Sequence, residues 1–337
     1  MQQSELIPER YREVAEHIAE TVRKMDRVLI AAHANPDGDA FGAVAAAGYM
    51  LRALGKEAFI YVTPRVPLNL SFIPLPGPVV TKLAHLPFEP RCALFLDCSE
   101  SHRLGPELDN LMSALESVNI DHHLGSEGMG SMANWVEPKG AATTQLVAYI
   151  ALALGLALKE DLATAVALGL VTDTGGFRYS NTSPEVLHLA AHLVANGCDL
   201  AALRAQLDNS WSLSRMRLWG ELMCRAEMRR SNTVAFCPIF LADLRSTGAH
   251  KEDLEGFVEQ LRQLHGVKVA AVLREDAPGC CKFSLRSSGT VDVCAAAALL
   301  GGGGHRNASG GTVRMTMEDA EANLLSAIGQ ELANEGL

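Results

Sequence analysis

The 337-residue chain has no excess of positive charge, no cysteine pair at CxxC spacing and no long apolar run. Its net charge of −10 argues against binding along duplex nucleic acid, because that binding depends on basic patches. Its eight cysteines contain no CxxC pair and are too sparse for a disulfide scaffold, so we expect reduced thiols in a cytoplasmic protein. Because no apolar run could span a bilayer, we expect no membrane partner.

Two further signals are missing near the start of the chain. Residues 1–5 contain no basic stretch followed by an apolar core, so we expect no signal peptide. The first predicted strand is not followed by GxGxxG, which argues against a Rossmann-type dehydrogenase. Hydrophobic residues make up 48% and charged residues 20% of the chain, as in globular proteins, and the length allows two domains.

Strand-like and helix-like segments alternate along residues 1–197. Buried strands are predicted at 28–32, 57–62 and 92–96, and a shorter strand is predicted to end at residue 120. Helices are predicted at 9–25, 40–54, 141–154, 161–171 and 184–196. The alternation predicts an α/β fold whose parallel sheet is covered by helices. Segment 198–230 looks wholly helical and is predicted to be a linker. Residues 231–337 are predicted to form a smaller α/β domain, with strands at 233–240, 267–273 and 281–285 and helices at 251–264, 291–300 and 317–333.

The stretch His33-Ala-Asn-Pro-Asp-Gly-Asp39 lies between the first predicted strand and an Ala-rich helix. In open α/β sheets, ligands bind beyond the carboxyl ends of the strands. Asp37 and Asp39 are separated by one residue, so they could serve two neighbouring metal ions. The structural alternative is a helix-capping aspartate beside a turn aspartate, with His33 as an ordinary loop residue.

Similar side chains follow later predicted elements: Asp97 after the strand at 92–96, Asp121-His122-His123 after residue 120, and Asp173 after the helix at 161–171. Oxygen and imidazole ligands without thiolates suit Mn²⁺ or Mg²⁺, and suit Zn²⁺ or Co²⁺ less distinctively. So many carboxylates at one crevice would repel one another unless cations lay among them. Two cations about 3.5–4 Å apart form a clamp for displacement at phosphorus.

Together these clusters resemble the four motifs of the DHH phosphoesterase superfamily. Residues 301–308, Gly-Gly-Gly-Gly-His-Arg-Asn-Ala, resemble the glycine-rich signature of its DHH-associated C-terminal domain. The resemblance extends over nearly the whole chain and is greatest to the nano-RNases, also described as phosphatases of 3′-phosphoadenosine 5′-phosphate (pAp). It implies a metal-dependent phosphodiesterase and phosphatase that hydrolyses nano-RNA, dinucleotides such as pApA, and pAp to mononucleotides.

The resemblance also implies roles for the individual residues. The implied ligands are His33, Asp37 and Asp97 for one divalent cation, and Asp39, Asp97, His122 and Asp173 for the other. Mn²⁺ is the expected ion, with Mg²⁺ or Co²⁺ as alternatives. Asp121 would orient a ligating histidine and His123 would face the phosphate. The structural alternatives are a turn cap for Asp121, core packing for His123 and a helix N-cap for Asp173.

Substrate phosphates require cationic side chains and backbone donors. Arg103 and Arg178 follow Asp97 and Asp173 and could bind a phosphate in bidentate fashion. Surface ion pairs are the alternative for both. In the C-terminal domain, the implied phosphate contacts are Arg286, Ser287, Gly303, Gly304 and His305, with the glycines expected in a loop that lets backbone N–H groups approach closely.

Other functions stay open at this point. Hydrolysis of cyclic dinucleotides such as cyclic di-AMP is a close variant, and a homodimer is an open alternative. A catalytically inactive nucleotide sensor would lack a ligand residue, whereas every expected ligand position is filled. The glycine-rich ending argues against inorganic pyrophosphatase, and the acidic charge argues against exonuclease action on long single strands.

Overall fold

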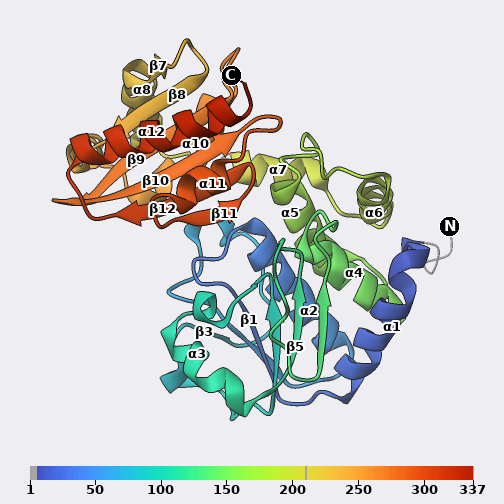
Figure 1. The fold of residues 1–337 in the computed structure, drawn as a ribbon. Coiled ribbons are helices and arrows are strands. Elements are labelled where there is room, and N and C mark those ends of the chain that lie inside the picture. Colours follow the sequence, from blue (N-terminus) through green and yellow to red (C-terminus); the bar gives the residue numbers. More distant parts are fainter. Residues whose placement is uncertain (1–5, 209–210, 337) are drawn as a thin grey trace. The chain divides into compact units, whose positions relative to one another are not determined.

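The computed structural model describes residues 6–208 and 211–336, and Figure 1 shows its elements. The chain divides into two compact units, Met1–Ser210 and Trp211–Leu337. Residues 1–5, where no signal peptide is expected, lie outside the described part. The N-terminal unit contains α1 (Glu9–Lys24), β1 (Val28–Ala32), α2 (Gly38–Ala53), β2 (Ala58–Tyr61), β3 (Val79–Val80), β4 (Cys92–Leu96), α3 (Pro106–Leu111), β5 (Glu116–Asp121), β6 (Ala133–Val136), α4 (Thr143–Ala153), α5 (Glu160–Asp173), α6 (Pro184–Ala195) and α7 (Leu200–Asp208).

The C-terminal unit has its own set of helices and strands. It contains α8 (Leu213–Arg225), β7 (Glu227–Arg229), β8 (Val234–Ile239), α9 (Leu241–Thr247), α10 (Phe257–Arg262), β9 (Val269–Ala277), β10 (Cys280–Ser287), α11 (Val293–Ala298), β11 (Gly303–His305), β12 (Ala308–Val313) and α12 (Met317–Asn334). Within the described residues, no single helix is long and apolar enough to cross a membrane, although α6 and α7, bent by 104°, pass that test as a pair.

The N-terminal sheet is parallel and has the strand order β3-β2-β1-β4-β5-β6. Every residue of β1 and β4 is buried, which explains their continuous apolar sequences. Val28 and Ile30 pack against the helices on one face, and Leu29 and Phe95 pack in the core on the other face. The predicted α/β class with a helix-covered parallel sheet is confirmed. Because β1, β4 and β5 run in the same direction, the residues that follow them meet at one edge of the sheet.

The C-terminal sheet is mixed, with the order β11-β12-β10-β9-β8-β7. Only its β8–β9 pair is parallel among the described strands. One face packs against α11 and α12 through residues such as Phe283 and Leu324. The other packs against α8 and α10 through residues such as Trp219 and Phe257. The predicted second α/β domain is therefore confirmed as a fold class.

Several segments differ from the sequence prediction. Residues 198–230 are not wholly helical, because Glu227–Arg229 forms an edge strand paired with β8. Their two helices divide between the units: α7 packs on α5, and α8 packs on β8. Residues 251–264 are not one helix, because Gly256, at φ +82°, separates a 3₁₀ turn (Lys251–Leu254) from α10. The short edge strands β3 and β6 were not predicted.

Candidate metal centre

The first acidic cluster lies where β1 leads into α2. Asp37 is the N-cap of α2, and its Oδ1 accepts hydrogen bonds from the N–H groups of Asp39 (3.1 Å) and Ala40 (3.0 Å). Its Oδ2 lies 3.8 Å from Nε2 of His33. A single carboxylate therefore both caps the helix and faces the histidine, so the two interpretations of Asp37 are compatible. Asp39, in the first turn of α2, is fully buried.

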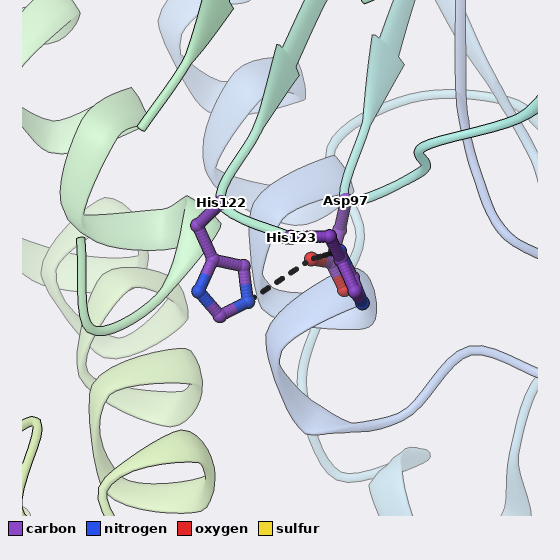
Figure 2. A group of neighbouring side chains, drawn as sticks. All are labelled: Asp97, His122 and His123. Carbon is purple, nitrogen blue, oxygen red and sulfur yellow. Dashed lines mark ion pairs between the residues drawn. The ribbon is translucent and has the colours of Figure 1, made fainter. Parts of the chain in front are cut away.

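Asp97 lies between two histidines. It directly follows β4, has a left-handed backbone (φ 52°) and donates its N–H to the Ile120 carbonyl at 3.0 Å. Its carboxylate is 2% exposed, with Oδ2 3.6 Å from Nε2 of His33 and Oδ1 3.5 Å from Nε2 of His122. Figure 2 shows Asp97 with His122 and His123. This is the position that a ligand shared by two cations requires.

The two histidines after β5 are held in different ways. Nδ1 of His122 lies 3.2 Å from the carbonyl of Gly140, so its Nε2 faces the carboxylates. From that Nε2, Oδ2 of Asp173 is 3.3 Å and Oδ2 of Asp39 is 3.8 Å away. Nδ1 of His123 lies 2.7 Å from Oδ1 of Asp121. Asp121 therefore orients His123 and not His122. Although burial acts to raise it, the pKa of Asp121 is lowered by its hydrogen bond with His123.

Asp173 reaches the centre from a helix. It is the last residue of α5, not the N-cap of a following turn, and its carbonyl accepts a hydrogen bond from Nδ2 of Asn181 at 3.0 Å. The same Nδ2 lies 3.2 Å from the carbonyl of Ala141, just before α4. Asn181 therefore ties the end of α5 to the start of α4.

Among the described residues, three groups place ligand atoms within 4.8 Å of one another: His33, Asp37 and Asp97; Asp39, His122 and Asp173; and Asp97, His122 and His123. Their imidazole-to-carboxylate distances, mostly 3.3–3.8 Å, exceed those of good hydrogen bonds. Ligand atoms around an ion held at about 2.1 Å lie roughly 3–3.5 Å apart. The oxygen and nitrogen donors therefore fit divalent cations, and Asp97 belongs to two of the groups.

The charges within the centre compete with one another. Burial, Asp173 and Asp97 raise the pKa of Asp39. Burial would also raise the pKa of Asp97, but His33 and His122 outweigh it and lower that pKa. Despite burial, the surrounding carboxylates raise the pKa of His33 to about 9 and that of His122 to about 10. The histidines of the centre therefore do not supply enough positive charge to balance its carboxylates. A bound cation would supply the rest.

The two predicted arginines of the N-terminal unit lie in different surroundings. Arg103 is in a 3₁₀ helix (Ser101–Leu104), and its carbonyl accepts the N–H of Ala34, the residue after His33, at 2.6 Å. Arg103 therefore lies beside the first cluster. Arg178 is exposed, and its Nε donates to the carbonyl of Gly175 at 2.7 Å. Its side chain is held against its own turn.

In the C-terminal unit, Arg286 and Ser287 point to opposite faces of β10 because they are consecutive strand residues. Nε of Arg286 donates to Oε1 of Glu259 at 2.7 Å. Ser287 is 1% exposed; its hydroxyl donates to the Val291 carbonyl at 2.7 Å and accepts from Nδ2 of Asn307 at 2.8 Å. Ser287 is thus used in a buried turn and does not share a face with Arg286.

The glycine run is an edge strand rather than the expected loop. Gly303–His305 forms β11 and pairs with β12, where His305 is opposite Ala308 and Ala308 is opposite Arg286. Residues opposite one another share a face, so His305 and Arg286 lie on the same side of the sheet. Gly304 lies very close to β12, since a Cβ there would lie 2.6 Å from the carbonyl oxygen of Ala308. Gly303 and Gly304 are exposed on this edge.

A pocket of about 320 Å³ lies on the Arg286 side of this sheet. Its lining includes Lys251, Glu259, Arg274, Lys282, Ser284 and Arg286. The cationic side chains suit an anionic ligand. Ser284, two residues before Arg286 on β10, lines the pocket in place of the predicted Ser287.

Two threonines that were not predicted as site residues support the centre. Thr143 and Thr144 donate hydrogen bonds to Asp97 and Asp39. Their position at the start of a predicted helix was the available signal, but helix starts commonly carry threonine as a cap. Glu259, the partner of Arg286, gave no signal because its neighbours in sequence are ordinary helix residues.

Comparison with known proteins agrees with this arrangement. The model of the DHH family, N-terminal domain, matches residues 27–170, and that of the DHHA1 domain matches residues 233–334. The chain is 35% identical to the bifunctional oligoribonuclease and PAP phosphatase NrnA of Thermus thermophilus over 97% of both chains. It is 26% identical to the cyclic-di-AMP phosphodiesterase GdpP of Geobacillus thermodenitrificans, over 95% of this chain but 50% of GdpP.

A solved structure supports the same assignment. An exopolyphosphatase-related protein from Bacteroides fragilis superposes with a TM-score of 0.86 at 26% identity, over 94% of this chain and 95% of that one. The chain therefore belongs to the DHH phosphoesterase family and carries a DHH domain followed by a DHHA1 domain.

Proposed function

We propose that this protein is a cytoplasmic, divalent-metal-dependent hydrolase of short oligonucleotides and pAp. Dinucleotides such as pApA would be cut to mononucleotides, and pAp would lose a phosphate. The observation that carries the proposal is the position of Asp97, whose two oxygens lie 3.6 Å and 3.5 Å from histidines of two different ligand groups. The similarity to NrnA over 97% of both chains supports the choice of substrates.

Two ligand groups that share Asp97 would hold two divalent ions. His33, Asp37 and Asp97 would hold one, and Asp39, Asp97, His122 and Asp173 the other. Mn²⁺ is our first choice, because oxygen and imidazole donors without thiolates suit it. Bound in pairs, such ions activate a water molecule and neutralise charge on the phosphoryl oxygens.

The remaining side chains of the centre would orient the phosphate. Asp121 holds Nδ1 of His123 at 2.7 Å, and with both ring nitrogens protonated His123 would donate from Nδ1 to Asp121 and from Nε2 to a phosphoryl oxygen. Arg103 would donate to the same phosphate group from the segment beside His33. Arg178, whose Nε donates to the Gly175 carbonyl, would contribute through its remaining guanidinium donors.

The pocket of the C-terminal unit would bind a terminal phosphate. Arg286 and Ser284 line it, and His305 lies on the same face of the sheet. The exposed backbone of Gly303 and Gly304 would allow a phosphate to approach closely. Ser287 has no part in this proposal, because its hydroxyl is used in a buried turn.

The test is a substrate panel on the full-length protein. After chelation and reconstitution with Mn²⁺, pApA, the corresponding DNA dinucleotide, pAp and cyclic di-AMP are offered separately, and the products are separated by chromatography. Turnover of pApA and pAp with release of mononucleotides is expected.

Other results would favour the alternatives. Turnover of cyclic di-AMP well above that of pApA would replace the proposal with a cyclic-dinucleotide phosphodiesterase, the activity in the name of the relative GdpP. Binding of these compounds without turnover of any of them would indicate an inactive nucleotide sensor.

A further inference from the structure

Two adjacent threonines at the start of α4 contact two buried carboxylates of the centre, Asp97 and Asp39. The Thr143 hydroxyl donates to Oδ1 of Asp97 at 2.9 Å, and the Thr144 hydroxyl donates to Oδ1 of Asp39 at 2.8 Å. The backbone N–H groups of both threonines also donate to Asp39. All four residues are at most 2% exposed. Because the four residues are buried, these hydrogen bonds act at a low local dielectric.

These hydrogen bonds give the two oxygens of each carboxylate different partners. Oδ1 of Asp39 accepts both the N–H (3.0 Å) and the hydroxyl of Thr144. Oδ2 of Asp39 accepts the N–H of Thr143 and is the oxygen that faces Nε2 of His122. In Asp97, Oδ1 accepts the Thr143 hydroxyl on the His122 side, and Oδ2 faces His33. Each threonine thus fixes which way one carboxylate is turned.

Close helix packing keeps Thr144 in this position. A Cβ on Gly169 of α5 would lie 2.1 Å from Oγ1 of Thr144 and 2.2 Å from Oδ1 of Asp39. A Cβ on Gly42 of α2 would lie 3.1 Å from Cγ2 of Thr144. The threonine is enclosed between two helices, each of which has a glycine at the contact.

We propose that Thr143 and Thr144 are positioning residues of the metal centre. Thr144 presents Oδ2 of Asp39 to one cation, and Thr143 holds the carboxylate of Asp97 that both cations share. Because the two threonines are consecutive in one helical turn, they also fix the separation of these carboxylates. The inference rests on the proposed function only for the presence of the cations. It concerns residues that touch neither substrate nor metal.

The test uses Thr144→Val and Thr143→Val, which remove one hydroxyl each but keep the backbone N–H donors and the side-chain shape. Mn²⁺ alone is titrated into the full-length apoprotein and its binding is measured by calorimetry. Loss of a partner that orients a metal ligand weakens metal binding by about 10–100-fold. We expect a loss of that size at one Mn²⁺ position for Thr144→Val and at both positions for Thr143→Val, because Asp97 is shared.

Two further variants separate the hydroxyl from general packing. Thr144→Ser retains the hydroxyl and should bind Mn²⁺ as the wild type does. Thr21→Val is the matched control, because Thr21 is also buried but donates only to the His17 carbonyl within α1, at 3.0 Å. Turnover of pApA should show a fall in kcat larger than any change in KM for the two valine variants at position 143 or 144.

The Mn²⁺ titrations decide whether Thr143 and Thr144 position the metal ligands. Wild-type Mn²⁺ affinity in folded Thr144→Val and Thr143→Val would overturn the inference. If a valine variant does not fold, Thr144→Ser still decides: weakened Mn²⁺ binding in that variant would show that packing of the methyl group, and not the hydroxyl, controls the centre. Absence of Mn²⁺ binding in the wild type would instead overturn the proposed function.

Discussion

Arg286 donates a hydrogen bond from Nε to Oε1 of Glu259 at 2.7 Å. The other carboxylate oxygen of Glu259 is buried and has no hydrogen-bond partner among the described residues. Both side chains line the pocket in which we place the terminal phosphate. A phosphate that binds Arg286 must therefore compete with Glu259 for the same guanidinium.

The first prediction follows from this competition. Glu259→Gln should lower KM for pApA roughly fivefold, because a partly exposed ion pair contributes up to about 1 kcal/mol. Steady-state kinetics on pApA measure the change. Glu255→Gln is the control, since Glu255 lines the same pocket and the variant makes the same change of charge. An unchanged KM in Glu259→Gln, or an equal decrease in both variants, would contradict a specific role for the ion pair.

The shared position of Asp97 predicts a severe loss of activity on substitution. Asp97→Ala should reduce kcat on pApA by more than about 1000-fold, because the metal centre supplies several kcal/mol of transition-state stabilisation. Asp26→Ala, at an exposed position between α1 and β1, should leave turnover unchanged. Hydrolysis by Asp97→Ala at the rate of the wild type would disprove the bridging role.

Asp121 should behave differently from the ligand residues. It contacts His123 and belongs to none of the three possible ligand groups. Asp121→Asn should therefore lower kcat by about 10–100-fold while Mn²⁺ affinity changes little. Calorimetry and turnover measured on the same preparation distinguish the two effects. A loss of Mn²⁺ affinity as large as the loss of kcat would show that Asp121 supports a ligand instead.

Metal binding should also stabilise the N-terminal unit. A ligand that binds only the folded state at a concentration of 100 times its Kd adds about 2.7 kcal/mol. Thermal unfolding of the chelated protein should therefore shift upward on addition of Mn²⁺ and return on renewed chelation. Asp97→Ala should show a much smaller shift. Equal shifts in both proteins would indicate Mn²⁺ binding at another place.

An ion pair in the C-terminal unit predicts a pH effect on stability. Arg225 forms a bidentate ion pair with Asp243. Oδ2 of Asp243 also accepts the N–H of Phe240, at the start of α9, at 2.8 Å. Although burial opposes it, the pair with Arg225 lowers the pKa of Asp243. The folded state thus binds this proton more weakly than the unfolded state. The contribution is complete above the ordinary aspartate pKa of about 3.9 and disappears as pH falls through the lower folded value.

Asp243→Asn should therefore lower the free energy of unfolding by about 1–3 kcal/mol at pH 7, and by progressively less below about pH 4. Urea unfolding of the wild type and the variant across this pH range measures the difference. Glu318→Gln, at an exposed position in the first turn of α12, is the control. A difference that stays constant down to pH 2 would mean that the charge of Asp243 is not what stabilises the unit.

The N-terminal fold and its acidic clusters were predictable because they depend on strong local signals. Continuous apolar runs such as Val28–Ala32 and Cys92–Leu96 mark strands buried on both faces, and their bounds match the prediction. Since parallel strands end at one edge, the residues after them had to converge. The contacts of Asp121 could not be predicted, because the choice between His122 and His123 depends on ring orientation.

The less predictable parts depend on contacts between distant residues. The edge strand Glu227–Arg229 is largely exposed, so it lacks the apolar pattern of a strand. The glycines of β11 oppose strand formation by propensity, yet β11 pairs with β12, which approaches Gly304 too closely for a side chain there. The different uses of Arg286 and Ser287 follow from the two faces of β10, which become distinguishable only once the sheet is assembled.

Asp39 receives its hydrogen bonds inside the layer where α2, α4 and α5 pack against one another. A metal-binding side chain held there keeps its position as long as those helices stay packed together. A metal-binding side chain on a surface loop could move without unfolding of the helices. Heating or denaturant should therefore abolish hydrolysis and the helical signal of the N-terminal unit in one cooperative step. With its metal bound, the enzyme would pass through no folded but inactive form as it is heated.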